Sequence, residues 1–309
     1  MADVEWPVKT REIFSHFFDS RVWNDFAFRD DDIIIATYAK SGTTWMQQII
    51  LQLIFDGAED QPLHQLSPWY DLRILAPELR TAIDSQTHRR FLKTHLPVDA
   101  LVFSPAARYL YIARDGRDAA WSFHNHHYNA TDDYFRMYNA DMPAGYPPLA
   151  RGSADPYEFY KTWLERDGYP FWPFWHHIRS WWAIRNLPNV MLVHFNDLKS
   201  DLEGSIRRIA SFLGIAVDER ALARIVSHCT FDYMKANAAK VAPRAGVSWA
   251  GGAETFINKG TNGRWRDRLT AADIAAYEQR AIADLGPDCA RWLAEGDPAL
   301  PVARPARGC

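Results

Sequence analysis

Short apolar runs recur along this 309-residue chain, each followed by a polar turn and then by apolar residues at helical spacing. The first unit begins with an apolar run at 32–37 and passes through a polar loop at 38–44. It continues as a helical segment until Gly57, a residue that commonly ends helices. The unit therefore predicts a strand, a loop and a helix in that order.

Two later segments repeat this pattern. One has a predicted strand at about 109–113 and a helix after the turn at Asp115 and Gly116. The other, "NVMLVHFNDLKSDLEGSIRRIASFLG", predicts a strand and then a helix in which Ser200 and Glu203 form a capping box and Gly214 is the stop. Because strands alternate with helices, we expect an α/β fold with a central, mostly parallel sheet flanked by helices.

A fourth candidate strand, "RRFLKTHLP", ends in Lys93 and His95 just before Pro97 breaks it. In a parallel sheet, ligands sit at the carboxyl ends of the strands. The four predicted strand ends therefore hold the candidate ligand groups.

Two stretches, 128–158 and 238–263, contain Pro, Gly and Asp clusters or small residues without a sustained period. We expect the first to be a long surface loop with at most a helical turn, and the second to be a similar loop or lid. Periodic segments resume beyond both without a change in character. Residues 1–309 are therefore predicted to form a single domain.

The composition of the chain says more about its binding partners than about its fold. The formal net charge is −3, so no global basic field favours nucleic acid or an acidic membrane, and any anion must be bound locally. Aromatic residues make up 14% of the chain, which predicts a large aromatic core, with a ring-lined pocket as the alternative.

The compartment is expected to be the cytoplasm. The start of the chain has acidic residues and no apolar signal region, and no apolar run is long enough for a membrane span. The three cysteines, Cys229, Cys289 and Cys309, form neither a disulfide framework nor a metal-binding spacing. We therefore expect reduced thiols and no metal site.

The first loop, "YAKSGTTW", predicts a site for a phosphate-like anion. Lys40 supplies a cation, Gly42 lets the backbone approach a ligand, and Thr43 and Thr44 lie where free N–H groups open a helix. The Walker A spacing is absent. In the alternative interpretation, Ser41 or Thr43 merely N-caps a core helix.

The second unit offers another anion site. Arg114 closes its strand and Ser122 follows eight residues later, so a guanidinium and a hydroxyl can converge. Alternatively, the Arg and Asp residues of "ARDGRD" pair with each other at the surface. The histidines at 124, 126 and 127 lack carboxylates or cysteines at ligand spacing and are interpreted as helix-end or pocket-wall residues.

Four motifs in this order, "YAKSGTTW", "LKTHLP", "IARDGRDAAWSF" and "FINKGTNGRW", resemble those of the cytosolic sulfotransferase family. With "VMLVHFNDLK" and "HCTFDYMK", the resemblance covers a core of about residues 30–275. It implies a P-loop-like phosphosulfate-binding loop and 3′-phosphoadenosine 5′-phosphosulfate (PAPS) as the donor co-substrate, without a metal.

The resemblance also implies which residues bind the donor. The residues of the first loop fall on positions that bind the 5′-phosphosulfate end of PAPS, and Trp45 and Phe231 on positions that flank its adenine. Arg114, Ser122 and the loop at 258–260 fall on positions that bind its 3′-phosphate. The implied donor-binding residues are Lys40, Ser41, Gly42, Thr43, Thr44, Trp45, Arg114, Ser122, Phe195, Cys229, Phe231, Asn258, Lys259 and Gly260.

The chain departs from the family pattern at several of these positions. Asn258 stands where many relatives have arginine, so a contact to the 3′-phosphate is weakened, and either Lys259 or Arg264 could replace it. Arg264 itself stands where many relatives have aspartate. Phe195 replaces a usual tyrosine and Cys229 a usual threonine, which keeps bulk and changes hydrogen bonding.

The predicted catalytic residues are His95, Lys93 and Lys40. A neutral histidine can take the proton of an acceptor hydroxyl, because its ordinary pKa lies near 6.5. Lys40 and Lys93 can stabilise charge on the oxygen of the breaking S–O bond. A sulfuryl group carries fewer charges than a phosphoryl group, so lysines can replace the magnesium of phosphoryl transfer.

The acceptor is expected to be a small molecule with a hydroxyl or amine, in an aromatic-lined pocket among Trp69, Tyr70, Phe123, His124 and residues 128–158. The alternatives are a P-loop kinase-like phosphotransferase and a non-catalytic nucleotide-binding protein. A lyase that eliminates the sulfate is a narrower variant. The sequence leaves a monomer or a homodimer open.

Overall fold

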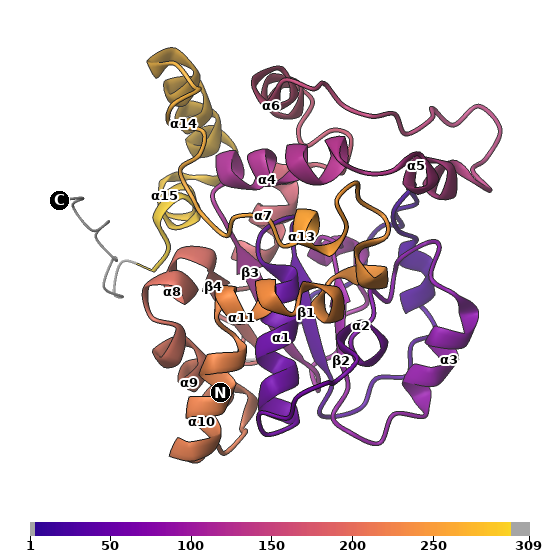
Figure 1. The fold of residues 1–309 in the computed structure, drawn as a ribbon, viewed down its shortest axis with the longest axis vertical. Helices are drawn as coiled ribbons and strands as arrows, with labels where there is room; N and C mark the ends of the chain where they lie inside the picture. The colour runs from indigo at the N-terminus through magenta and orange to yellow at the C-terminus, as the bar shows by residue number, and fades with distance from the viewer. Residues whose placement is uncertain (1–3, 298–309) are drawn as a thin grey trace.

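A computed structural model describes residues 4–297 of the chain. Its sheet has four parallel strands in the order β2-β1-β3-β4 (Figure 1). The strands are β1 (Ile33–Thr37), β2 (Phe91–Thr94), β3 (Arg108–Ala113) and β4 (Val190–His194). The predicted parallel sheet is confirmed.

Helices cover both faces of this sheet. The α-helices are α1 (Thr43–Ile54), α2 (Leu63–Leu66), α3 (Pro77–Asp84), α4 (Gly116–Tyr128), α5 (Asp132–Asn139), α6 (Pro156–Glu165), α7 (Phe174–Ala183), α8 (Phe195–Ser200), α9 (Leu202–Leu213), α10 (Glu219–His228), α11 (Phe231–Ala236), α12 (Ala238–Val241), α13 (Ala253–Phe256), α14 (Ala271–Leu285) and α15 (Pro287–Glu295). Three 3₁₀ turns are η1 (Ser20–Trp23), η2 (Val98–Ala100) and η3 (Pro243–Gly246).

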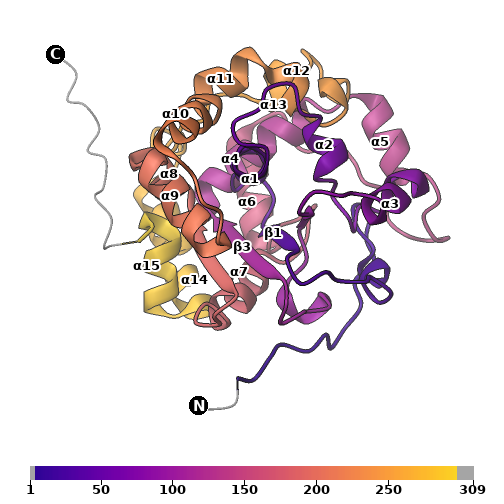
Figure 2. The same ribbon diagram turned by 90° about the horizontal axis from the view of Figure 1, so that it is seen from below.

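Successive side chains of β1 enter two different cores, because the side chains of a strand alternate between its faces. Ile33 and Ile35 pack with residues of α1, α9 and α10. Ile34 and Ala36 pack with the aromatic residues of α6, α7 and α14. Figure 2 shows α1 and α7 on opposite sides of β1 and β3. With both faces covered, every residue of β1 is buried, and all but Thr37 are apolar, as is common in parallel strands.

The strand order reverses at β1. From β1 the chain crosses to β2 on one side, and later places β3 on the other side. Such a reversal opens a crevice at the carboxyl ends of the two neighbouring strands. The loops after β1 and β3 meet there, where Arg114 Nη1 donates a hydrogen bond to the Lys40 carbonyl oxygen at 3.3 Å.

The predicted loop at 128–158 is more helical than expected. It contains the two turns of α5, whose N-cap Thr131 accepts a hydrogen bond from the Tyr134 N–H. Tyr134 and Tyr138 lie one turn apart and are both buried, so their rings hold the helix against the core. The stretch 238–263 likewise contains α12, η3 and α13.

The predicted capping box at the third unit is wrong. α8 ends at Ser200, and Asp201 is the N-cap of α9, where its carboxylate accepts a hydrogen bond from the Gly204 N–H at 2.8 Å. An aspartate is a strong N-cap, so the cap lies one residue later than predicted. The predicted stop is confirmed, since Gly214 ends α9 with a φ of 67°.

Two of the three cysteines lie in the described part of the chain. Cys229 and Cys289 are buried free thiols, and Cys309 lies outside the described residues. Within residues 4–297, no helix is long and apolar enough to cross a membrane. The same residues contain no group of three His, Cys, Asp or Glu side chains placed to hold a metal ion.

Candidate active site

A cavity of about 800 Å³ opens at the carboxyl ends of β1, β2 and β3. Most of the residues predicted to bind the donor or to act in catalysis line it. These are Lys40, Gly42, Thr43, Thr44, Trp45, Lys93, His95, Arg114, Ser122, Phe195, Phe231, Asn258, Lys259 and Gly260.

Two predicted residues, Ser41 and Cys229, are fully buried outside the cavity wall. The Ser41 hydroxyl has no hydrogen-bond partner among the described residues. Burial raises the pKa of the Cys229 thiol, while its carbonyl oxygen accepts a hydrogen bond from Trp45 Nε1 at 2.7 Å. Cys229 therefore contributes to the site by orienting Trp45.

The loop after β1 presents an open helix start to the cavity. The N-cap of α1 is Gly42, with a φ of 109° and no side-chain cap, so the alternative in which Ser41 or Thr43 caps the helix is wrong. A Cβ on Gly42 would lie 2.8 Å from Ile112 Cδ1, so only glycine fits. Because no side chain caps the first turn, its N–H groups are available to an anion.

His95 follows the end of β2 and has one defined ring orientation. Its Nδ1 lies 2.7 Å from the Thr37 carbonyl oxygen, and a carbonyl oxygen can only accept, so Nδ1 carries the proton. Trp69 packs edge-on against the ring at 4.6 Å between centroids. The other nitrogen, Nε2, has no hydrogen-bond partner in residues 4–297, and is the atom left with a free lone pair.

His95 is neutral at physiological pH. Burial, followed by the charge of Lys93, lowers its pKa from 6.5 to about 3, although the bond to Thr37 raises it and Lys40 lowers it further. A neutral imidazole with Nδ1 protonated is a base at Nε2. The site therefore holds a histidine ready to accept a proton.

Lys40 lies in the turn between β1 and α1 and has a left-handed backbone, with a φ of 65°. Its Nζ lies 3.3 Å from Nδ1 of His126 and 4.7 Å from the centre of the Phe256 ring. Burial, followed by the charges of Arg114 and Lys93, lowers its pKa to about 7. An anion bound beside Lys40 would favour its charged form.

Lys93 enters the cavity from β2, with its Nζ 5.5 Å from the centre of the Trp69 ring. Burial lowers its pKa to about 8, and the carboxylate of Asp71 opposes that shift. Asp71 is fully buried and accepts hydrogen bonds from Trp23 Nε1, Trp69 Nε1 and Thr94 Oγ1. Its own pKa is raised by burial to about 6.

Arg114 connects the ends of β1 and β3 to a late loop. Besides the Lys40 carbonyl, its guanidinium donates to Asn262 Oδ1 at 2.8 Å and to the Thr261 carbonyl at 2.9 Å. It also stacks over Phe195 at 4.4 Å. An Arg–Asp ion pair does form within "ARDGRD", but it joins Arg117 to Asp115 at 2.7 Å and is buried rather than at the surface. Arg114 takes no part in it.

Aromatic rings line the part of the cavity between α1 and α11. Trp45 and Phe195 meet edge to face at 5.3 Å, and Phe231 lies against Gly260. A Cβ on Gly260 would lie 2.5 Å from Phe231 Cδ2, and its φ is 61°. Flat rings beside a cationic loop can hold a nucleotide base near its phosphates.

The sequence interpretation missed several residues that line the cavity, including Lys199 and Asp118. For His126 it left two roles open, at the end of a helix or in the wall of the pocket. Lys199 Nζ donates to the Gly260 carbonyl at 2.7 Å, and Asp118 accepts from the Gly263 N–H at 2.7 Å. These contacts join segments far apart in the chain, so no local pattern signals them. The structure places His126 in the cavity wall, which is one of the two roles considered for it.

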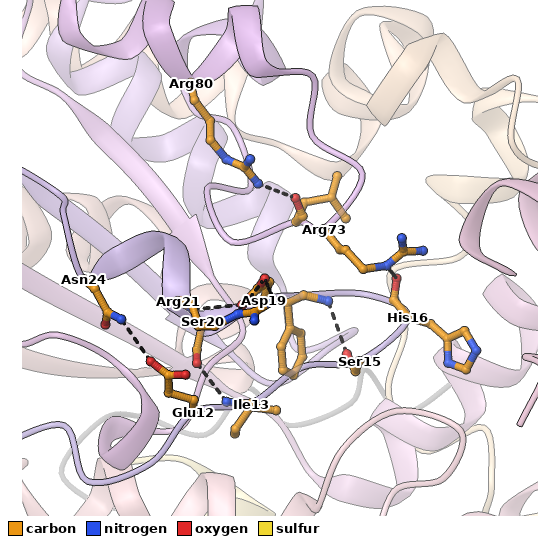
Figure 3. A network of polar contacts seen from close by, with 12 residues as sticks. Glu12, Ile13, Ser15, His16, Asp19, Ser20, Arg21, Asn24, Arg73 and Arg80 are labelled. Carbon is orange, nitrogen blue, oxygen red and sulfur yellow. Dashed lines mark hydrogen bonds and ion pairs between the residues drawn. The ribbon is translucent and has the colours of Figure 1, made fainter. Parts of the chain in front are cut away.

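The other side of the cavity is apolar and aromatic. Its lining includes Phe17, Trp69, Leu72, Ile74, Leu75, Leu79, Tyr134, Met137, Tyr138, Phe171 and Trp249. Arg73 ties two segments of this wall together, donating to the His16 carbonyl at 3.2 Å and to the Tyr138 carbonyl at 2.6 Å. Figure 3 shows the Arg73 guanidinium beside the backbone of His16.

Trp69 was correctly predicted to line this wall, but Tyr70, Phe123 and His124 do not. Tyr70 packs against Trp23 at 4.7 Å, and Phe123 packs against Phe171 at 4.0 Å inside the core. His124 Nε2 bonds to the Ser153 carbonyl at 3.0 Å. These side chains are directed into core or loop contacts, which their sequence neighbours do not reveal.

Comparison with known proteins agrees with this geometry. The sulfotransferase domain family matches residues 30–284 of the chain. A glycolipid sulfotransferase of Mycobacterium tuberculosis is 34% identical over 315 residues, which cover 94% of this chain and 97% of that protein. Human sulfotransferase 2B1 is 30% identical over 81% of this chain and 65% of its own length.

Solved structures share the fold. Retinol dehydratase in complex with androsterone and the inactive cofactor PAP superposes with a TM-score of 0.67 and 25% identity, over 86% of this chain and 83% of that one. A mouse sulfotransferase complexed with PAP gives the same TM-score at 24% identity, over 88% and 90% of the two chains. With the domain match across most of the sequence, the chain belongs to the sulfotransferase family and is an enzyme of that family.

Proposed function

We propose that the enzyme transfers a sulfuryl group from PAPS to a hydroxyl or amine of a small acceptor, with His95 as the general base. The observation that carries the proposal is the 2.7 Å contact between His95 Nδ1 and the Thr37 carbonyl, which leaves Nε2 as the free base. Lys40 and Lys93 line the same cavity and supply the cations that this chemistry needs.

The cavity has the features that a donor nucleotide requires. The uncapped start of α1 and Lys40 suit the phosphosulfate, Arg114 and Ser122 suit a second phosphate, and rings at Trp45 and Phe231 suit a base. The structural relatives that contain PAP support this assignment. When bound, PAPS supplies the sulfuryl group and a phosphate leaving group.

His95 would receive the acceptor proton at Nε2 while Nδ1–H keeps its bond to Thr37. That bond fixes the tautomer and stabilises the imidazolium that forms. The pKa of about 3 belongs to the protein without a ligand, and an anion bound near His95 favours the protonated ring. The acceptor oxygen and the leaving oxygen would then lie in line about the sulfur.

Lys40 and Lys93 would stabilise the negative charge that develops on the leaving phosphate. Fixed cations in a water-poor cavity stabilise such charge more than they do in bulk water. This proposal needs no metal. A kinase-like phosphotransferase is the alternative, and it predicts magnesium-dependent turnover of ATP.

The apolar wall favours an acceptor with an apolar body that presents one nucleophilic group to His95. The name of the mycobacterial relative, a glycolipid sulfotransferase, is compatible with such an amphiphile. Three expectations stay predictions: a small-molecule acceptor, a cytoplasmic location, and a monomeric or homodimeric state.

The proposed function is tested with labelled PAPS and a metabolite extract, followed by identification of the labelled product by mass. We expect a sulfated product that forms in the presence of a chelator. His95→Ala and His95→Asn should lose product formation at least a hundredfold while still binding PAP, and His124→Ala, outside the cavity, should keep it. Substantial turnover by both His95 variants would remove His95 as the base.

The rival functions give different results in the same assay. Magnesium-dependent ATP turnover without sulfation would favour the kinase-like alternative. Failure to sulfate any compound of a broad acceptor panel would favour a non-catalytic nucleotide-binding protein. A dehydrated product in place of a sulfated one would identify the lyase variant.

A further inference from the structure

The contact between Lys40 and His126 joins two residues that are 86 positions apart in the chain. Lys40 Nζ is 3.3 Å from His126 Nδ1, and an ammonium group can only donate, so Nδ1 is the acceptor. His126 has its pKa lowered well below the ordinary value, first by burial and then by the charge of Lys40, so the ring is neutral. Its Nε2 therefore carries the proton.

This is the one hydrogen bond that Lys40 Nζ makes within residues 4–297. The Phe256 ring, 4.7 Å away, covers the ammonium from another side. The backbone of Lys40 is fixed separately, because its carbonyl accepts from Arg114 and its φ is 65°. His126 is therefore the polar group that determines where the ammonium lies.

The His126 ring is itself held in place by aromatic and backbone contacts. Trp249 packs against it at 4.8 Å between centroids and donates from Nε1 to the His126 carbonyl at 3.1 Å. The neighbouring Asn125 donates to the Thr255 carbonyl at 3.1 Å, which fastens α4 to α13. The acceptor nitrogen thus approaches Lys40 from a rigid wall.

We infer that His126 is a positioning residue for Lys40: the neutral Nδ1 of His126 accepts a hydrogen bond from the Lys40 ammonium, favours its charged form and directs it into the cavity. A hydrogen bond to a charged donor stabilises the charged form. This effect opposes burial and the repulsion that Arg114 and Lys93 exert on Lys40.

The contact with His126 is important because, in the part of the chain that the structure describes, none of the other polar groups around Lys40 accepts a hydrogen bond from its ammonium. Arg114 and Lys93 are cations, His95 is neutral, and the Asp118 carboxylate of α4 already accepts from the Gly263 N–H. The importance of a charged Lys40 for turnover rests on the proposed function. The contact with His126 does not depend on it.

The experiment measures the pKa of Lys40 in the protein without any nucleotide. Each lysine is labelled by trace acetic anhydride across a pH series, and the extent of labelling is read by peptide mass. His126→Phe keeps a ring and removes the acceptor, while His126→Gln restores an acceptor. His124→Phe, on the same helix, controls for loss of a histidine.

We expect the pKa of Lys40 to fall by about one pH unit in His126→Phe, to recover most of that loss in His126→Gln, and to stay unchanged in His124→Phe. Exposed Lys161 should titrate alike in all of them. An unchanged pKa in His126→Phe, or equal falls in the Phe and Gln variants, would overturn the inference.

If His126→Phe does not fold, His126→Leu and His126→Asn give the same comparison with two side chains of the same branching and number of heavy atoms. A sulfation assay on the wild type tests the proposed function separately. An enzyme without sulfation activity whose Lys40 shows the expected shifts would contradict the proposed function alone.

Discussion

The Nδ1 atom of His95 lies 2.7 Å from the Thr37 carbonyl oxygen, so the candidate base is oriented by the backbone of the central strand. The Thr37 hydroxyl lies 3.1 Å from the same nitrogen and 2.7 Å from the hydroxyl of Thr43. A single residue at the end of β1 thus contacts both the base and the first turn of the phosphate-binding helix.

We predict that Thr37→Val lowers stability more than it lowers turnover. The substitution leaves the buried Thr43 hydroxyl without its partner, which costs about 1–3 kcal/mol, but it keeps the carbonyl that orients His95. Urea denaturation and kcat should show a stability loss with less than a tenfold loss of kcat. Thr37→Ser, which keeps the hydroxyl, is the control. A folded Thr37→Val without turnover would mean that the hydroxyl holds the imidazole.

Gly42→Ala should destabilise the protein by roughly 2–4 kcal/mol and weaken PAP binding. The new methyl group would combine a left-handed backbone with a contact of 2.8 Å to Ile112. Gly145 has a φ of 83°, and a Cβ added there would meet no atom within 4 Å, so Gly145→Ala measures the backbone strain alone, at about 1 kcal/mol. Equal losses in the two variants, measured by urea denaturation, would contradict the packing argument.

Asp71→Asn should cost about 1–3 kcal/mol of stability, because either orientation of the new amide sets its NH₂ against an indole N–H of Trp23 or Trp69. Loss of the carboxylate should also lower the pKa of Lys93, which its charge now raises. Chemical denaturation at pH 7.5 and lysine labelling measure the two effects. Asp30→Asn, an exposed site, is the matched control, and no difference between the two would refute the role of Asp71.

The free energy of unfolding should fall steeply as the pH is lowered from about 6.5 to 4. Six histidines have pKa values lowered far below the ordinary one, so the unfolded chain binds more protons than the native one in this range. They are His64, His95, His126, His127, His177 and His194.

Three buried carboxyl groups oppose this trend. Burial raises the pKa values of Asp71 and Asp197 to about 6 and also raises the pKa of Asp118, so the native protein binds these protons more tightly than the unfolded chain does. Each group contributes at most about 1.4 kcal/mol per pH unit, and the balance gives a slope of at most roughly 4 kcal/mol per pH unit. Urea denaturation at several pH values measures it. A constant stability between pH 7 and 5 would contradict the prediction.

The sequence predicted the strands and the loops that follow them because these depend on local patterns. The apolar run before Lys40 and the turn after it are contiguous, and their period identifies a strand and a helix. The predicted capping box failed by one residue, since Ser200 and Asp201 are both good caps and only the end of α8 decides between them.

The rest depends on contacts between distant segments. The bond from Arg73 to the Tyr138 carbonyl spans 65 residues, and that from Lys199 to the Gly260 carbonyl spans 61. Neither has a local signature. Likewise, the sequence placed His126 beside two other histidines on one helix, but only the packing of α4 over the β1 loop distinguishes it from them.

The cavity wall is far more basic than the chain that forms it. It contains seven basic side chains, and Asp118 is the one acidic side chain found there among the described residues. The wall therefore has a formal charge of +6, while the whole chain has a formal charge of −3, so all other residues together have a formal charge of −9. We therefore expect the attraction for anions to be confined to the cavity, so that a compact anion that fits inside is bound while the rest of the chain, with its negative formal charge, does not attract bulky polyanions.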